Sequence, residues 1–262
     1  MLNPNDSGAC ARDVRINAYL RAVAPQGRAA IRCGPFLATF DTRSDTPFRN
    51  YAVPDDRAVP TAPEIEAFAR LCAAYGRYPR LEYAPGAAPG LEAALVRAGF
   101  SVEMRPPMMT CGAGQVRACP PPEGFTVADG SGPDALAAAV AVQTAAYAEH
   151  GLSGDGDPQP LASSIAAGGA LFLATEDRTG AAAGAGQFTP PHAGVAEVAG
   201  IGVAPLFRRR GLASALTSAI AAEAFRRGVE LAFLTPGGTA AQRAYERAGF
   251  VCDGEMVMIS RP

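Results

Sequence analysis

Lysine is absent from this chain of 262 residues, so all 23 of its basic residues are arginines. A phosphate-binding P-loop requires a lysine after its last glycine, and Schiff-base catalysis requires a lysine amine, so the sequence excludes both. The net charge of −2 provides no electrostatic basis for binding nucleic acid or an anionic membrane. We therefore expect neither of these partners.

Histidine is scarce, with two residues, and the six cysteines form no C-x-x-C pair. Their spacing does not match that of a zinc site of histidine and cysteine ligands, so we expect no metal. Unpaired thiols are typical of a reducing compartment. The first 13 residues lack the apolar stretch of a signal peptide, and no apolar run is long enough to cross a bilayer. We therefore expect a cytoplasmic protein.

The segment from Ile201 to Ser214 is the most informative part of the sequence. It is typical of a buried strand that ends in a turn and leads into an alanine-rich helix. The first turn of a helix has backbone N–H groups without an internal partner, and the macrodipole adds partial positive charge there. Three arginines precede Gly211, and the small residues Gly211 and Ala213 would let an anion approach the backbone. The turn therefore predicts a site for a phosphate or pyrophosphate.

The second half of the chain alternates strand and helix patterns, with glycine and proline between them. The predicted strands cover residues 125–128, 171–175, 183–188, 195–203, 229–234 and 251–259. The predicted helices cover residues 133–149, 161–167, 208–227 and 240–248. Two helices, an antiparallel meander and a strand–helix–strand unit indicate the α+β class.

Two patterns in this half resemble the GNAT acyltransferase superfamily. Arg208-x-x-Gly211-x-Ala213 is similar to the turn that holds the pyrophosphate of acetyl-coenzyme A (acetyl-CoA) in that family, and Tyr245 precedes a Gly-Phe pair as it commonly does there. The resemblance covers roughly residues 125–259 and implies acetyl-CoA as co-substrate, with its pantetheine arm along the preceding strand. The implied binding residues are Ile201, Gly202, Val203, Arg208, Arg209, Arg210, Gly211, Leu212, Ala213 and Ser214.

The resemblance also implies two catalytic residues. Tyr245 occupies the position of a tyrosine that protonates the departing thiolate; the alternative is an amphipathic core tyrosine. Glu197 lies in the middle of a predicted apolar strand and would be the general base; the alternative is a carboxylate on the open side of that strand. One position departs from the family pattern, because Gly238 stands where relatives often have asparagine.

The first half of the chain repeats part of the second at an offset of 150 residues. Residues 81–84 align with 231–234, and 94–100 align with 244–250, including the same Arg-Ala-Gly-Phe corner. This indicates duplication of a whole domain. The first copy lacks the implied site residues: Ala58, Thr61 and Pro63 replace the motif of the turn, and Leu95 replaces the tyrosine.

The sequence therefore predicts two tandem GNAT-like domains of the α+β class, each a mostly antiparallel mixed sheet flanked by helices. The degenerate domain is expected at residues 1–111, a proline-containing linker at 112–124, and the acetyltransferase domain at 125–262. The tandem chain would be a pseudo-dimeric monomer or a homodimer. The predicted reaction is direct transfer of an acetyl group from acetyl-CoA to a primary amine of a small molecule or peptide.

Two other functions stay open: a non-catalytic CoA-binding or regulatory module, and a transferase of a longer acyl group. The small residues at 183–186 would permit the wider slot that a longer acyl group needs. The acidic loop at residues 150–160, with Asp155 and Asp157 beside Glu149, would suit a cationic amine, or is simply a solvated turn. The sequence does not identify the acceptor.

Overall fold

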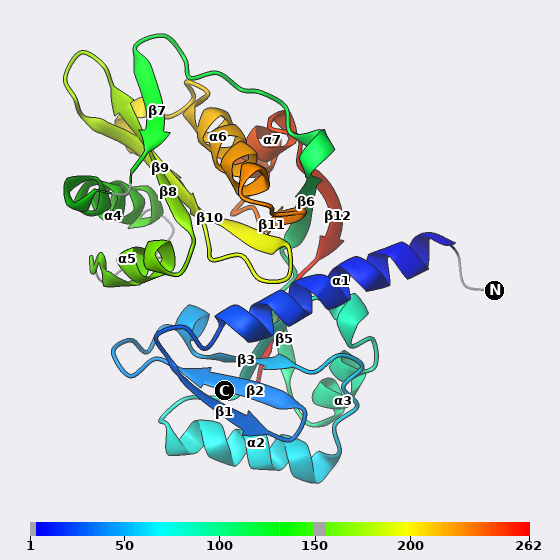
Figure 1. The fold of residues 1–262 in the computed structure, drawn as a ribbon. Helices are drawn as coiled ribbons and strands as arrows, with labels where there is room; N and C mark the ends of the chain where they lie inside the picture. The colour runs from blue at the N-terminus through cyan, green and yellow to red at the C-terminus, as the bar shows by residue number, and fades with distance from the viewer. Residues whose placement is uncertain (1–3, 131, 149–155) are drawn as a thin grey trace. The chain divides into compact units, whose positions relative to one another are not determined.

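The structure, a computed structural model, describes residues 4–130, 132–148 and 156–262. The chain divides into two compact units, Met1–Met108 with Asp253–Pro262, and Met109–Cys252 (Figure 1). Each unit is built around one mixed sheet with helices packed on it, which confirms the predicted α+β class with two tandem domains.

The first unit contains a six-stranded sheet in the order β1-β2-β3-β4-β13-β5. Its strands are β1 (Ala29–Cys33), β2 (Phe36–Phe40), β3 (Tyr51–Pro54), β4 (Arg80–Tyr83), β5 (Ser101–Met104) and β13 (Val257–Ser260). Its helices are α1 (Pro4–Val23), α2 (Ala62–Ala74) and α3 (Leu91–Arg97), with short 3₁₀ turns η1 (Pro47–Arg49) and η2 (Pro85–Ala87). All neighbouring strands are antiparallel except β3 and β4, which are parallel.

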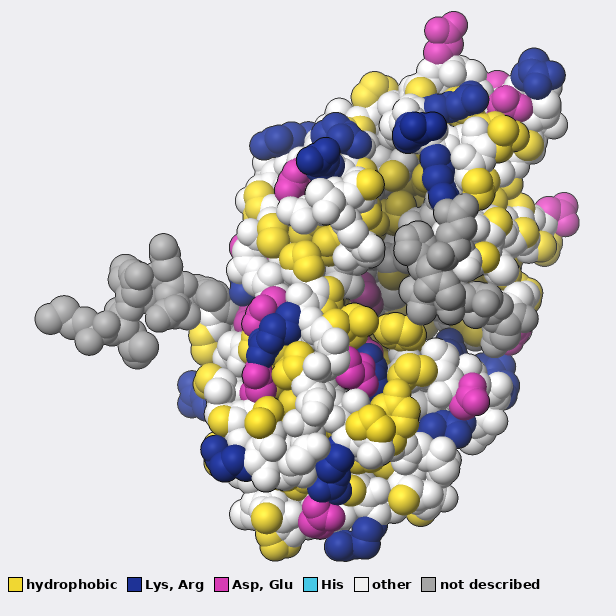
Figure 2. Space-filling model, turned by 180° about the vertical axis from the view of Figure 1, so that it is seen from behind, with side chains coloured by type: hydrophobic (Ala, Val, Ile, Leu, Met, Phe, Trp, Pro, Cys, Tyr) yellow, Lys and Arg dark blue, Asp and Glu magenta, His cyan; other side chains and the backbone are white. Residues whose placement is uncertain are grey.

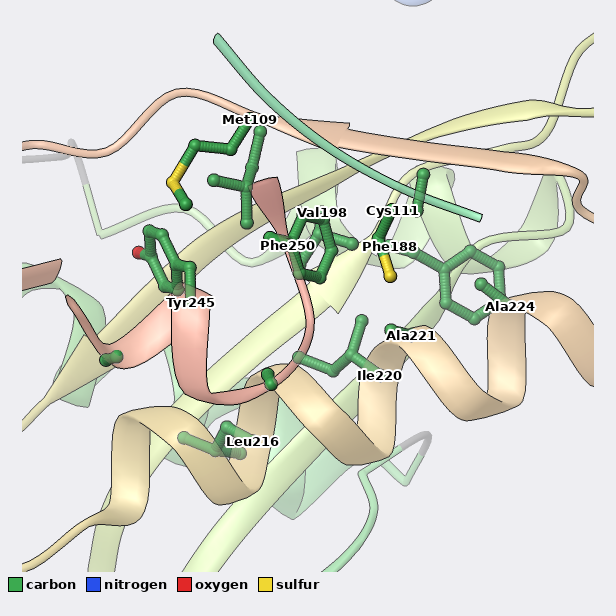
Figure 3. Close-up of a cluster of buried hydrophobic side chains, with 14 of the residues drawn as sticks. Met109, Cys111, Phe188, Val198, Leu216, Ile220, Ala221, Ala224, Tyr245 and Phe250 are labelled. Atoms are coloured by element: carbon green, nitrogen blue, oxygen red, sulfur yellow. The ribbon is translucent and has the colours of Figure 1, made fainter. Parts of the chain in front are cut away.

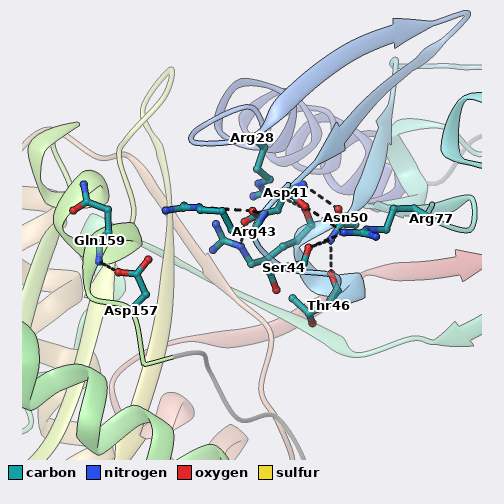
Figure 4. A network of polar contacts seen from close by, with 10 residues as sticks. Arg28, Asp41, Arg43, Ser44, Thr46, Asn50, Arg77, Asp157 and Gln159 are labelled. Carbon is teal, nitrogen blue, oxygen red and sulfur yellow. Dashed lines mark hydrogen bonds and ion pairs between the residues drawn. The ribbon is translucent and has the colours of Figure 1, made fainter. Parts of the chain in front are cut away.

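A buried polar network holds the connection between β2 and β3 in the first unit (Figure 4). The Asn50 side chain accepts the Asp41 N–H at 2.9 Å and donates to the Ser44 carbonyl at 2.9 Å. Burial opposes ionisation of Asp41, but hydrogen bonds from the Arg43 N–H and the Arg49 guanidinium hold the pKa of its carboxyl below the ordinary value. The loop is therefore fixed by its own side chains.

The second unit contains a seven-stranded sheet in the order β12-β6-β11-β10-β9-β8-β7. Its strands are β6 (Pro107–Gly112), β7 (Phe125–Asp129), β8 (Ala170–Glu176), β9 (Ala182–Phe188), β10 (Val195–Val203), β11 (Leu231–Leu234) and β12 (Val251–Glu255). Its helices are α4 (Pro133–Ala148), α5 (Gln159–Ala166), α6 (Leu212–Arg226) and α7 (Thr239–Arg247), with η3 (Ala113–Gln115) and η4 (Pro205–Phe207). In this sheet β10 and β11 are parallel, while the pairs β11–β6, β10–β9, β9–β8 and β8–β7 are antiparallel.

The repeated Arg-Ala-Gly-Phe corner has the same backbone geometry in both units. Gly99 ends α3 with φ +85° and Gly249 ends α7 with φ +103°, a conformation that favours glycine. In each corner the N–H of the phenylalanine donates to a carbonyl five residues earlier, Phe100 to Leu95 and Phe250 to Tyr245, both at 3.1 Å. Both helices therefore end in a Schellman-type cap, and the corner fixes the end of α7 on which Tyr245 lies.

The two units exchange their last strands. β6 and β13 occupy equivalent positions at the 150-residue offset, yet β6 pairs with β11 in the second unit while β13 pairs with β4 and β5 in the first. The predicted single strand at residues 251–259 is therefore two strands in two different sheets, β12 and β13. The exchange also makes the boundaries of the units differ from those of the predicted domains. Residues 109–111 belong to the second unit, and residues 253–262 belong to the first.

The segment predicted as a linker packs against the second unit. The Arg117 N–H donates to the Ala248 carbonyl at 3.0 Å, and its carbonyl accepts from the Ser218 hydroxyl at 2.9 Å. The Gln115 carbonyl lies so near Gly249 that an added Cβ would come within 2.0 Å of its oxygen. A side-chain hydrogen bond from Ser218 of α6 and a backbone hydrogen bond to the end of α7 thus hold this segment in place.

Helix α6 supplies one wall of the core of the second unit (Figure 3). Leu216, Ile220 and Ala224 recur every four residues and are fully buried, as expected for an apolar helix face on a sheet. The helix approaches β9 closely: a Cβ added at Gly184 would lie 3.0 Å from Leu216, and one at Gly186 would lie 2.8 Å from Ile220. The glycines of β9 therefore make room for α6.

No described helix is both long and apolar enough to cross a membrane. On the face that Figure 2 shows, arginine and acidic side chains are interspersed with apolar ones.

Candidate active site

A pocket of about 870 Å³ opens in the second unit between β10 and β11 and extends to the first turn of α6 and along α7. Its lining residues on the strands and the turn are Glu197, Val198, Ala199, Gly200, Ile201, Gly202, Val203, Phe207, Arg208, Arg209, Gly211, Leu212, Ala213, Leu234 and Thr235. Those on α4, on α7 and before it are Ala146, Tyr147, Gly237, Gly238, Thr239, Ala240, Ala241, Arg243, Ala244, Tyr245 and Arg247.

The pocket exists because β10 leaves its parallel neighbour. The described pairing of β10 with β11 covers only Val195, Ala196 and Glu197, whereas β10 continues to Val203. In a fully paired central strand, the edge of β10 beyond Glu197 would form hydrogen bonds with β11. Here that edge lines the pocket instead. The backbone from Val198 to Val203 therefore lines a space that an extended ligand can enter.

The turn between β10 and α6 is built on two left-handed residues. Arg209 has φ +62° and Gly211 has φ +92°, and no side chain caps the N–H groups at the start of α6. A Cβ added at Gly211 would meet no atom within 4 Å, so its glycine serves the backbone conformation rather than packing. The first-turn amides thus face the pocket without a side-chain acceptor, as an anion site requires.

The three arginines of this turn have three different environments. The Arg208 guanidinium donates to the Val203 carbonyl at 3.3 Å and to the Ala146 carbonyl at 3.2 Å, so it joins the end of β10 to α4. Arg210 lies over the rings of Phe125 and Phe207 at 5.7 and 5.8 Å. Arg209 lines the pocket and Arg210 does not.

Ser214 is the other predicted binding residue outside the pocket lining. It is buried, and its hydroxyl accepts the Arg247 Nε–H at 3.0 Å. This contact places Arg247, which does line the pocket, beside the first turn of α6. Sequence reasoning selected neither Arg247 nor Arg243, because an arginine on an exposed helix face carries no signal of a site.

Tyr245 lies at the boundary between core and pocket. Its ring belongs to the buried cluster, and Figure 3 shows its hydroxyl directed away from Phe250, Val198 and Phe188. Burial, and then the nearby Tyr147 phenol, raise the pKa of Tyr245 well above its ordinary value. The hydroxyl therefore remains protonated at neutral and moderately alkaline pH.

Glu197 also lines the pocket, at the point where β10 and β11 separate. Its side chain is half-buried, so it is neither enclosed among apolar neighbours nor fully exposed on the open side of the strand, which were the two environments that the sequence left open. It is the one carboxylate among the described lining residues.

Two residues of α4 reach the site without any sequence signal. The Gln143 amide donates to the Gly200 carbonyl at 2.7 Å, and the Tyr147 hydroxyl donates to the Ile201 carbonyl at 3.0 Å. Both lie on a helix whose composition gives no amphipathic pattern. Of the predicted acidic loop, Glu149 to Asp155 lie outside the described residues, and Asp157 accepts the Gln159 N–H at 2.9 Å at the start of α5.

The equivalent turn of the first unit is closed by its own side chains. Thr61 precedes α2, and the Glu64 carboxylate accepts both its N–H at 2.8 Å and its hydroxyl at 2.7 Å. These hydrogen bonds, the backbone one first, lower the pKa of Glu64, so a negative charge already occupies this helix start. No group of three or more metal-ligating side chains occurs in the part of the chain that the structure describes.

Comparison with known proteins matches residues 144–250 to the acetyltransferase (GNAT) family. The chain is similar to a GCN5-related N-acetyltransferase from Kribbella flavida, with 27% identity, a TM-score of 0.81 and 95% of each chain covered. It is also similar to one from Sphaerobacter thermophilus, with 23% identity and a TM-score of 0.51 over 71% of this chain and 61% of that one. No curated protein matches.

A tandem GNAT protein from the clavulanic acid biosynthesis pathway, without AcCoA, shares the fold with a TM-score of 0.65 and 16% identity over 99% of this chain and 96% of that one. The matched residues 144–250 contain the whole pocket and lie within the second unit. Residues 144–250 therefore match the acetyltransferase (GNAT) family, the chain has a tandem GNAT fold, and these matches support an acyltransferase activity in general.

Proposed function

We propose that the second unit binds one acetyl-CoA per chain and transfers its acetyl group to a primary amine in a ternary complex. The observation that carries this proposal is one continuous pocket that joins the separated strand β10, the uncapped start of α6 and the buried Tyr245. In this proposal the pantetheine arm lies along Ile201, Gly202 and Val203, and the pyrophosphate lies on the first-turn amides of α6.

The charges of the pocket support this orientation. Arg209 is in the turn, and Arg243 and Arg247 are on α7, so cationic groups lie where the phosphates of CoA would be. Glu197 is at the other end of the exposed part of β10. A cationic amine would be attracted toward that end, whereas phosphates would be attracted toward the arginines.

The proposed chemistry needs no covalent enzyme intermediate. The amine nitrogen attacks the thioester carbonyl carbon, the C–S bond breaks, and Tyr245 donates its proton to the departing sulfur. The amine loses one proton, to Glu197 through water or directly to solvent, and the Tyr245 phenolate regains one from solvent. The Val203 N–H is the proposed donor to the oxyanion.

The longer-acyl alternative loses its supporting observation. The small residues at 183–186 were the reason to consider a wider slot, and two of them are filled by α6 side chains: Leu216 at Gly184 and Ile220 at Gly186. Acetyl therefore stays the proposed group.

Replacing Glu197 with glutamine is expected to lower kcat/KM mainly at low pH. A carboxylate base matters most where the amine is protonated, while at high pH the free amine attacks without help. The measurement is the pH profile of acetyl transfer, with Glu246→Gln as the matched control, because Glu246 follows Tyr245 on α7 but does not line the pocket. Equal loss at all pH values would rule out the role as base.

Calorimetric titration with acetyl-CoA tests the binding step. We expect one site per chain, because the first unit fills its equivalent turn with Glu64. Arg209→Gln should raise Kd about threefold to tenfold by removing a charge from the phosphate end, while Arg210→Gln, whose guanidinium lies on two rings, should change Kd less than twofold. Two sites would show that the first unit also binds. Binding without thioester consumption across an amine panel would favour the non-catalytic module.

A further inference from the structure

We infer that Gln143 and Tyr147 of α4 are positioning residues that hold the part of β10 on which acyl-CoA binds. This inference rests on the proposed function of the pocket. It starts from an irregularity in β10: the pairing of β10 with β9 shifts register between Ala199 and Gly202, so a bulge lies in the stretch that lines the pocket. A bulge bends its strand and leaves backbone groups outside the sheet ladder.

The carbonyls at this bulge are satisfied by α4. Gln143 donates to the Gly200 carbonyl at 2.7 Å, and Tyr147 donates to the next carbonyl, that of Ile201, at 3.0 Å. Two consecutive carbonyls of a regular strand point to opposite neighbours, so their capture by one helix is a property of the bulge. Loss of either donor would remove a hydrogen bond from a carbonyl in a partly buried site, which is unfavourable.

The glycines of β10 are explained by the same contact. Gly200 has φ +65°, and a Cβ added there would lie 2.5 Å from the Gln143 Nε2. A Cβ added at Gly202 would lie 3.0 Å from the Ala146 Cβ and 3.4 Å from the Gln143 Cα. Glycine at positions 200 and 202 therefore lets α4 contact the backbone of the bulge. Arg208 adds a further contact between the end of β10 and α4, because it donates to the Ala146 carbonyl.

Tyr147 also connects this junction to the reacting end of the pocket. It lines the pocket, burial raises the pKa of its phenol to about 12, and its phenol is near enough to Tyr245 to affect the ionisation of that residue. A neutral Tyr147 hydroxyl that donates to the Ile201 carbonyl thus holds the strand, while its phenol lines the same pocket as the proposed acid Tyr245. The inferred role of Tyr147 is to hold the backbone from Ile201 to Val203 in its binding conformation before the ligand binds.

The test compares Tyr147→Phe and Gln143→Leu with Tyr83→Phe in the full chain. Tyr83 is a matched control because it is a buried tyrosine of the first unit whose hydroxyl has no hydrogen-bond partner among the residues that the structure describes. In the ligand-free protein, amide hydrogen exchange of peptides that cover residues 198–204 should accelerate about threefold to tenfold in the two α4 variants, the range expected for one lost hydrogen bond. It should not change in Tyr83→Phe.

The second readout is affinity for acetyl-CoA by calorimetry, supported by the KM for acetyl-CoA with any amine that gives turnover. Both constants should rise about threefold to tenfold in Tyr147→Phe, with kcat changed less than the KM and with a melting temperature like that of Tyr83→Phe. Normal exchange or normal affinity in both α4 variants would overturn the inference. Failure of the unmodified protein to bind acetyl-CoA would instead overturn the proposed function, and the inference with it.

Discussion

Replacing Tyr245 with phenylalanine is expected to lower kcat about 100-fold or more while leaving the Kd for acetyl-CoA within about twofold. General acid catalysis by a positioned group contributes about 10²- to 10⁴-fold. The ring stays in the buried cluster with Phe250 and Val198, so only the hydroxyl at the pocket is lost. The measurement is steady-state kinetics beside calorimetric binding, with Tyr83→Phe as the control for loss of a buried phenol.

The pH dependence of the unmodified enzyme gives the same hypothesis a second test. Because burial and Tyr147 raise the pKa of Tyr245, the phenol keeps its proton above the ordinary tyrosine pKa of about 10. A group that acts as an acid limits the rate only where it has lost its proton. We therefore expect no fall in kcat up to about pH 10. A Tyr245→Phe variant with full kcat would show that Tyr245 is a core tyrosine without a chemical role.

Local features of the sequence were sufficient to predict the elements of the second unit from β7 to α7 and the turn before α6. Strand and helix periodicity depends on neighbours along the chain, and so does the need for glycine at position 211, where φ is positive. The predicted helix at 208–227 begins four residues later, at Leu212, because Arg209 and Gly211 are left-handed. The pattern thus located the turn but specified neither its left-handed residues nor the first residue of the helix.

The roles of individual side chains depended on tertiary contacts that no local pattern contains. Arg208, Arg209 and Arg210 are consecutive and chemically identical, yet Arg208 joins β10 to α4 at the pocket wall, Arg209 lines the pocket, and Arg210 lies over two aromatic rings outside the lining. Gln143 and Tyr147 reach β10 only because glycine at 200 and 202 lets α4 approach. Sequence reasoning could identify those glycines as close-approach positions, but it could not name the helix that approaches.

The exchange of last strands was also outside the reach of sequence patterns. β6 and β13 are short apolar strands of similar composition, and hydrophobicity does not specify which of two similar sheets a strand joins. Their equivalence at the 150-residue offset follows from the duplication, because each sheet keeps a position for a final strand. The chain fills each position with the strand from the other copy.

This exchange predicts which fragment of the chain will fold. Residues 122–262, cut within the predicted linker at 112–124, lack β6 and are expected to be unfolded or aggregated. Four residues of β6 pair with β11, and Met109 and Cys111 are fully buried in the core of the second unit. Burial of one such methionine contributes about 1.5–3 kcal/mol, and β11 would also lose its hydrogen-bonded neighbour, against a typical domain stability of about 5–15 kcal/mol.

Residues 107–255 are the matched fragment, because they contain β6 to β12 and omit β13, which belongs to the first unit. We expect this fragment to unfold cooperatively on heating and to bind acetyl-CoA, since every residue of the pocket lies within it. Thermal unfolding and calorimetry of the two fragments check this. If residues 122–262 fold and bind as well as residues 107–255, then β6 is dispensable and β13 can take its place at β11. That result would mean that each unit can also form with the last strand of its own copy. The exchange in the full chain would then be determined by how the two copies are connected, and not by the packing of the strands' side chains.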